Sequence, residues 1–120
     1  MAKEYRVPLR VRTQRMVLRP FFRGLFHALY RVRLTGRENV PKSGPYIIAH
    51  NHVSIVDPPF VLSFWPVVAE AIGTEELWQR RGQATIVRLY GTIPVERNRA
   101  MDREFLKKLV TLLKEGHPLM

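Results

Sequence analysis

The sequence predicts an α/β domain, with a mixed sheet flanked by helices and a basic amphipathic helix at the N-terminus. Apolar runs of strand length alternate with helical patterns, which is typical of layered α/β folds. The chain has 120 residues, of which 46% are hydrophobic, enough for one globular domain. It contains no cysteine, which excludes a disulfide framework, a cysteine nucleophile and cysteine-ligated zinc, and favours a cytosolic compartment.

Residues 1–33 form the first predicted unit, a basic arm over residues 1–13 followed by a helix over residues 14–34. Pro20 is awkward inside a helix, so the helix is alternatively expected to begin there. Residues 1–37 hold ten basic residues and one acidic residue, so they carry most of the net charge of +10. An apolar face beside a basic face suits a helix lying in an anionic membrane interface. The residues expected at this surface are Arg19, Phe22, Arg23, Phe26 and Arg31. The alternative is a helix that packs in the core with its arginines facing water.

Residues 34–120 form the second predicted unit. Two glycines and two prolines mark residues 34–45 as loop, and strands are expected at 46–50, at 66–69 and at 92–96. Helices are expected from about Asp57 to residue 64, at 75–81 and at 100–115, where Gly116 provides a C-terminal cap. Residues 85–90 fit either a strand or a helix, and residues 117–120 resemble the start of another strand.

His52 and Asp57 follow the strand expected at 46–50 and form a candidate pair of general base and orienting carboxylate. Histidine transfers protons near neutral pH, and a carboxylate on its far ring nitrogen fixes the tautomer. Five residues of ideal helix would place the two side chains roughly 140° apart, so the pair needs a turn, which Pro58 favours. The spacing leaves two alternatives open: Asp57 as a helix N-cap, and His52 as a turn histidine bonded to backbone.

Other classes of site have weaker signals. The longest stretch without Asp, Glu, Lys or Arg is residues 43–56, which is too short for the roughly 18–20 residues of a membrane-spanning helix. No signal peptide is apparent at the N-terminus. His50, His52 and Asp57 would need a distant ligand such as His117 to hold a metal, so we expect no metal site.

Two sequence blocks resemble those of a known family. The matching residues are Asn51, His52, Ser54 and Asp57 in the first block, and Gly91, Ile93, Pro94 and Arg97 in the second. These blocks, and the loop that leads to the first, resemble Asn-His-x-x-x-x-Asp and Gly-x-Ile-Pro-Val-x-Arg of the glycerolipid acyltransferases of the 1-acylglycerol-3-phosphate acyltransferase type. The resemblance spans residues 34–120 and implies the fold of that family.

The resemblance also implies roles. His52 would take the proton of the acceptor hydroxyl, Asp57 would orient and charge-stabilise His52, and Arg97 would hold the acceptor phosphate. Guanidinium groups bind phosphate through paired, charge-assisted hydrogen bonds; the alternative is a solvated Arg97. The reaction would move a fatty acyl group from a thioester, on coenzyme A or an acyl carrier protein, to the hydroxyl of 1-acyl-glycerol-3-phosphate in phospholipid biosynthesis. It needs no cofactor.

The family's third block, Phe-Pro-Glu-Gly-Thr-Arg, and a later proline-containing block have no counterpart in this chain. We therefore expect the N-terminal part of an acyltransferase domain, located as a peripheral protein on the cytoplasmic face of a membrane. One alternative is a nonenzymatic membrane-surface module that binds lipid. Another is a nucleic-acid-binding protein, which is disfavoured because the basic residues share their segment with an apolar face and no nucleic-acid-binding motif is apparent.

Overall fold

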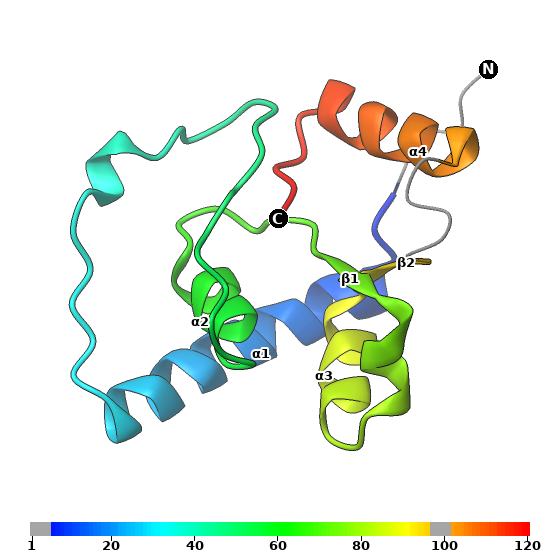
Figure 1. Ribbon diagram of the computed structural model, residues 1–120. Helices are drawn as coiled ribbons and strands as arrows, with labels where there is room; N and C mark the ends of the chain where they lie inside the picture. The colour runs from blue at the N-terminus through cyan, green and yellow to red at the C-terminus, as the bar shows by residue number, and fades with distance from the viewer. Residues whose placement is uncertain (1–5, 97–101) are drawn as a thin grey trace.

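The computed structural model describes residues 6–96 and 102–120, which form an α/β arrangement of helices with a small parallel sheet (Figure 1). The helices are α1 (Leu9–Leu29), α2 (Asp57–Phe64), α3 (Gln83–Tyr90) and α4 (Arg103–Lys114). The strands are β1 (Ile72–Thr74) and β2 (Ile93–Val95), and short 3₁₀ helices cover Arg37–Asn39 and Glu75–Gln79. The predicted α/β class is confirmed.

The sheet is parallel throughout the described residues. Strand β1 pairs with β2, with Ile72 opposite Ile93. Two further bridges place Leu119 between Ile47 and Glu70, again in parallel. No antiparallel pairing occurs within residues 6–96 and 102–120. The described residues therefore form a parallel sheet, whereas a mixed sheet was expected. Helical crossovers explain the result, because they return the chain in the same direction before the next strand.

Several predicted elements lie where the sequence placed them, and others are displaced. Helix α2, strand β2 and helix α4 match their predictions, and residues 85–90 are helical in α3. The strand expected at 46–50 is reduced to the single bridge at Ile47. The strand expected at 66–69 begins later, since the ladder uses the N–H groups of Glu70 and Ile72, and proline at position 66 has no N–H to donate.

Helix α1 begins at Leu9 and includes Pro20. The prediction of a basic arm that precedes the helix is therefore wrong for residues 9–13, and the helix does not start at Pro20. Pro20 leaves the carbonyl of Met16 without its intrahelical donor. Both residues are exposed, so water can bond that carbonyl. The helix ends at Leu29, earlier than expected, and the N–H of Tyr30 bonds the carbonyl of Phe26.

A buried ion pair joins α1 to the sheet. Both guanidinium NH₂ groups of Arg15 donate to the Glu70 carboxylate at 2.8 Å, and the two side chains are only 4% and 3% exposed. Arg15 Nε donates to the carbonyl of Tyr90 at 2.7 Å, and its guanidinium lies 4.5 Å from the centre of the Tyr90 ring. The charge of Arg15 is thus neutralised inside the protein, and removal of either partner would leave a buried charge unpaired.

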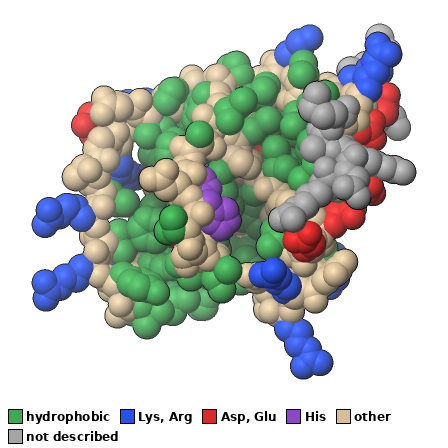
Figure 2. Space-filling view, viewed as in Figure 1, with side chains coloured by type: hydrophobic (Ala, Val, Ile, Leu, Met, Phe, Trp, Pro, Cys, Tyr) green, Lys and Arg blue, Asp and Glu red, His purple; other side chains and the backbone are tan. Residues whose placement is uncertain are grey.

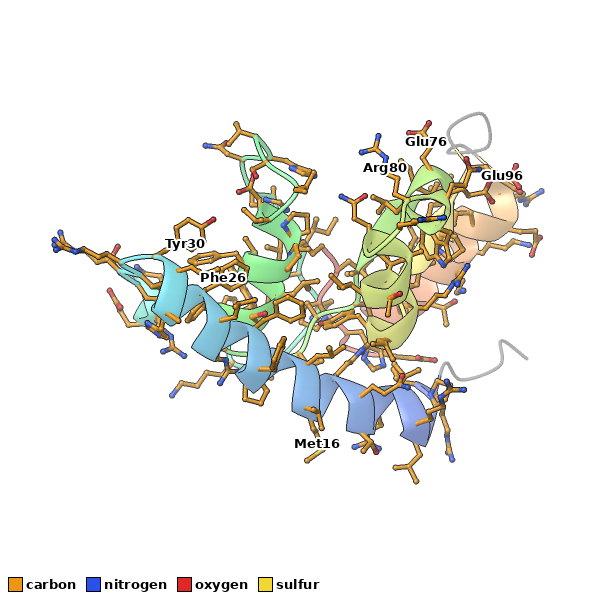
Figure 3. All side chains as sticks on the ribbon, turned by 90° about the horizontal axis from the view of Figure 1, so that it is seen from below. Met16, Phe26, Tyr30, Glu76, Arg80 and Glu96 are labelled. Atoms are coloured by element: carbon orange, nitrogen blue, oxygen red, sulfur yellow. The ribbon has the colours of Figure 1, made fainter. Side chains whose placement is uncertain are left out.

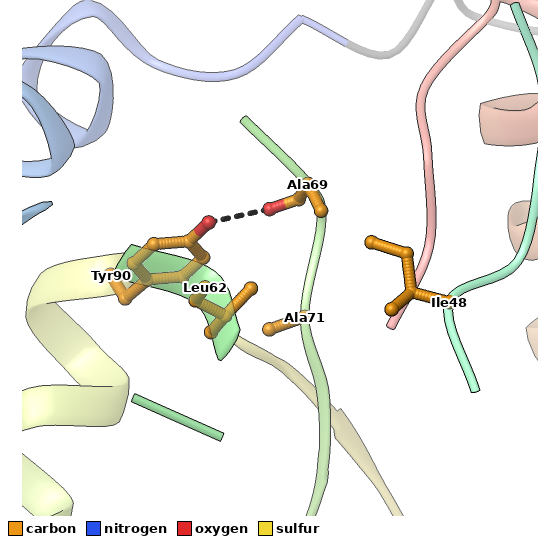
Figure 4. Close-up of a cluster of buried hydrophobic side chains, with 5 residues drawn as sticks. All are labelled: Ile48, Leu62, Ala69, Ala71 and Tyr90. Atoms are coloured by element: carbon orange, nitrogen blue, oxygen red, sulfur yellow. Dashed lines mark hydrogen bonds between the residues drawn. The ribbon is translucent and has the colours of Figure 1, made fainter. Parts of the chain in front are cut away.

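The central core lies around Tyr90 (Figure 4). Its hydroxyl donates to the carbonyl of Ala69 at 2.6 Å, and Ile48, Leu62 and Ala71 belong to the same buried cluster. Burial raises the pKa of Tyr90 to about 12, so the hydroxyl stays neutral and available as a donor. A second cluster, of Ile93, Leu112 and Leu119, attaches α4 to the sheet.

Helix α1 also holds α2. Phe26 of α1 packs against Phe60 and Phe64 of α2, with ring centroids 5.2 and 6.3 Å away. Arg19 donates to the carbonyls of Leu62 and Trp65, and Arg23 donates to that of Ser63. These carbonyls lie at the C-terminal end of α2, where a helix lacks internal donors and favours positive charge. The arginines therefore help to fix α2, whose other end carries Asp57.

Candidate active site

Asp57 is the first residue of α2 and organises the turn that precedes it. Its Oδ2 accepts hydrogen bonds from the backbone N–H groups of Val53 and Ser54, both at 2.7 Å. These bonds lead back into the turn, so among the described residues the carboxylate does not cap the helix. The turn closes further through the bond from Asp57 N–H to the Ser54 carbonyl. The sequence thus places the carboxylate close to the preceding His52.

His52 faces this carboxylate. Its Nδ1 lies 3.6 Å from Asp57 Oδ2, with the histidine side chain 57% exposed and the aspartate 25% exposed. The distance exceeds the 2.7–3.2 Å of typical N–H···O bonds, so the contact is electrostatic and not a hydrogen bond. Since Nδ1 faces Asp57, Nε2 is the nitrogen left for an incoming group. Among the described residues no backbone bond to His52 is present, so the structure favours the paired arrangement.

Asp57 is held in its ionised form. Hydrogen bonds from the amides of Ser54 and Val53 lower its pKa, and the neighbouring His52 contributes in the same direction. A carboxylate that stays negative near neutral pH can both fix the tautomer of His52 and stabilise its protonated form.

The other members of the first block support the turn. The carbonyl of Asn51 lies 2.9 Å from Nδ1 of His50, and Ser54 Oγ accepts from Val56 N–H at 3.4 Å. The rings of His50 and His52 are 5.7 Å apart. His50 is thus a neighbour of His52 that makes a different contact, which makes it a useful control.

An apolar pocket of about 300 Å³ lies beside the two histidines. In the space-filling view, histidine atoms lie amid hydrophobic side chains (Figure 2). His50 and His52 are on its wall, with lining residues from α1, α2, β1 and α3 that include Leu18, Phe22, Leu62, Ile86 and Tyr90. An apolar cavity with a few polar groups is the usual form of a small-molecule site, so the arrangement brings a candidate base to the edge of a space for an apolar group.

The second block performs mainly structural tasks in the described residues. Gly91 ends α3 with φ 74°, and a Cβ there would lie 2.6 Å from Val11 of α1, so glycine permits both the left-handed turn and the close approach. Ile93 is buried in β2. Pro94 is exposed on that strand, which pairs with β1 alone, consistent with the edge position expected for proline. Arg97 lies outside the described residues.

The residues expected at a membrane surface are divided by the structure. Phe26 is 4% exposed in contact with α2, Phe22 lines the apolar pocket, and Arg19 and Arg23 bond carbonyls of the protein. Their assignment to the outer surface is therefore corrected, because this side of α1 packs on the body of the protein. Arg31 is exposed. No helix within the described ranges is long and apolar enough to cross a membrane.

The described residues contain no group of three or more histidine, aspartate or glutamate side chains arranged to hold a metal ion. In the candidate group of His50, His52 and Asp57, the ring of His52 faces the Asp57 carboxylate and the ring of His50 lies 5.7 Å from that of His52.

A histidine that faces a carboxylate beside an apolar pocket is an arrangement suited to general-base catalysis on a substrate with an apolar part. The family model described as Acyltransferase matches residues 31–120, and the chain belongs to this family. Acyl transfer is the general activity that this membership supports. No solved structure matches the chain.

Sequence reasoning missed the pocket and the buried ion pair. The pocket brings together α1, α2, β1 and α3, which no local pattern can show. Arg15 offered a signal, because it stands on the same helical stripe as Val11, Leu18 and Phe22, where a solvated arginine is out of place.

Proposed function

We propose that the protein transfers a fatty acyl group from a thioester, on coenzyme A or an acyl carrier protein, to the free hydroxyl of 1-acyl-glycerol-3-phosphate. The observation that carries the proposal is the placement of His52, paired with Asp57, on the wall of the apolar pocket. The pocket would take an acyl chain, and Nε2 of His52 would meet the hydroxyl.

The chemistry follows from the two residues. His52 Nε2 removes the hydroxyl proton while the oxygen attacks the thioester carbonyl, which forms a C–O bond. Collapse of the tetrahedral intermediate breaks the C–S bond, and the proton on His52 passes to the departing thiolate. Asp57 keeps Nδ1 protonated and stabilises the imidazolium during the reaction. General acid–base catalysis of this kind contributes about 10²–10⁴-fold to rate.

The phosphate of the acceptor is assigned to Arg97 on the family resemblance. Such a contact would distinguish the phosphorylated acceptor from monoacylglycerol, because a guanidinium binds phosphate through two parallel hydrogen bonds.

The proposal is tested with a long-chain acyl-CoA as donor and lysophosphatidate as acceptor. Thiol release is followed alongside mass-spectrometric detection of phosphatidate. We expect both products in equal amounts, and weaker turnover with monoacylglycerol. Thiol release that does not depend on an acceptor would indicate hydrolysis and contradict the proposal, as would a folded chain without turnover.

The proposed location is the cytoplasmic face of an anionic membrane, with α1 as the contact. Support comes from the outward face of the helix, where Met16 is 76% and Phe21 is 63% exposed, with Val17, Leu25 and Leu29 also exposed. In Figure 3, Met16 points away from the body of the protein whereas Phe26 points toward α2. An apolar helix face with arginines at its edges suits a membrane interface.

Cosedimentation with vesicles containing phosphatidylglycerol tests this location. Phe21→Glu is expected to reduce binding at least tenfold, because it puts a charge into the apolar face. Leu106→Glu on exposed α4 is the matched control. Equal binding of wild type and Phe21→Glu would contradict the assignment of this face to the membrane.

A further inference from the structure

A second cleft lies along the N-terminal half of α1. It is open to solvent, has a volume of about 950 Å³, and is lined by Arg6, Arg12, Arg15, Arg19 and Arg23, with Glu70 as its carboxylate. Arg19 borders both this cleft and the pocket at His52, but neither His52 nor Asp57 lines the cleft. It is therefore a separate feature of the surface.

Part of the positive charge of this cleft has no carboxylate partner among the described residues. Glu70 is engaged by Arg15 at 2.8 Å. Within residues 6–96 and 102–120, no carboxylate lies at ion-pair distance from Arg12, Arg19 or Arg23. Arg19 and Arg23 instead donate to backbone carbonyls, which satisfy hydrogen-bond donors without removing the charge.

The crowding of these cations disfavours the charged form of Arg19. Burial and the nearby charge of Arg23 lower the pKa of Arg19. Arg19 and Arg23 also stand four residues apart on α1, and like charges at that spacing destabilise a helix. An anion in the cleft would relieve this repulsion.

We infer that this cleft binds the phosphate group of an amphiphilic ligand. Several guanidinium groups around one cavity match the charge and the acceptor geometry of a phosphate or diphosphate. Val7, Met16, Pro20 and Val68 line the same cleft, and they supply an apolar wall for the rest of the ligand. Two sources share this chemistry, the head group of an anionic phospholipid and a soluble organic phosphate. The inference does not depend on acyl transfer.

Titration of the full chain with inorganic diphosphate, followed by calorimetry, tests the site. Saturable binding at one site is expected, weakened at least tenfold by Arg12→Glu and less than twofold by Arg33→Glu. Both arginines are exposed, so the variants lose the same charge with little effect on folding, which circular dichroism verifies. The absence of saturable binding, or equal weakening by the two variants, would overturn the inference.

Vesicles separate the two sources. If the ligand is a lipid head group, Arg12→Glu weakens binding to phosphatidylglycerol vesicles more than Arg33→Glu does, and diphosphate displaces the wild type. If it is a soluble phosphate, diphosphate still binds in solution but leaves vesicle binding unchanged. Either result, together with the calorimetric difference, supports the phosphate site. The thiol-release assay reports separately on acyl transfer.

Discussion

Replacing Glu70 with glutamine is expected to destabilise the protein by about 3–5 kcal/mol, because the charge of Arg15 remains buried without its partner. The pair consists of two charge-assisted bonds of 2.8 Å between side chains that are 4% and 3% exposed. Such bonds contribute about 1.5–3 kcal/mol each. A domain typically has a free energy of unfolding of only about 5–15 kcal/mol. Glu70→Gln would therefore remove a large fraction of the stability of the protein.

Urea unfolding followed by circular dichroism measures the loss. In the matched control Glu104→Gln, the partner Lys107 is 61% exposed, and a change below about 1 kcal/mol is expected. The double variant Arg15→Met/Glu70→Met should recover much of the loss, because apolar side chains leave no buried charge. A Glu70→Gln variant within 1 kcal/mol of wild type, or a double variant less stable than the single one, would refute the reasoning.

Two further predictions concern the site and the glycine turn that supports it. Gly91→Ala should cost more than about 1 kcal/mol in urea unfolding, because the residue has φ 74° and its new Cβ would lie 2.6 Å from Val11. Gly116→Ala, with φ 86° and no atom within 4 Å, carries the backbone strain alone, so equal losses would exclude the Val11 contact. Asp57→Asn should lower turnover by up to about 10⁴-fold. The pKa of Asp57 in the folded state is lowered from 3.8. Its ionised form therefore stabilises the fold above that pH, and this stabilisation is lost as the pH falls through the lowered pKa. An acid-unfolding profile of Asp57→Asn identical to that of the wild type would contradict this.

Local signals in the sequence predicted the elements that local chemistry determines. Asp57 and Pro58 mark the start of α2. Gly116, with φ 86°, follows the end of α4 and turns the chain away from the helix. A turn between His52 and Asp57 was predicted only as the condition under which the two side chains could pair. Its hydrogen bonds, from two backbone amides to one carboxylate oxygen, became visible only in three dimensions.

Long-range packing explains what the sequence did not predict. The sequence shows Arg15 only as one of the ten basic residues in residues 1–37. Its partner Glu70 lies 55 residues away, and both side chains are buried. Phe26 was assigned to a membrane surface, but α2 covers it. A helical pattern shows that a face is apolar, whereas the body of the protein decides which part of that face remains outside.

The most direct test of the account compares His52→Ala with His50→Ala in the acyl-CoA and lysophosphatidate assay. The two histidines lie on the same pocket wall with rings 5.7 Å apart, and only His52 faces Asp57. We predict that His52→Ala loses at least about 100-fold in turnover, while His50→Ala stays within a few-fold of wild type. Equal turnover in His52→Ala and wild type, or a greater loss in His50→Ala, would contradict the assignment of His52 as the general base.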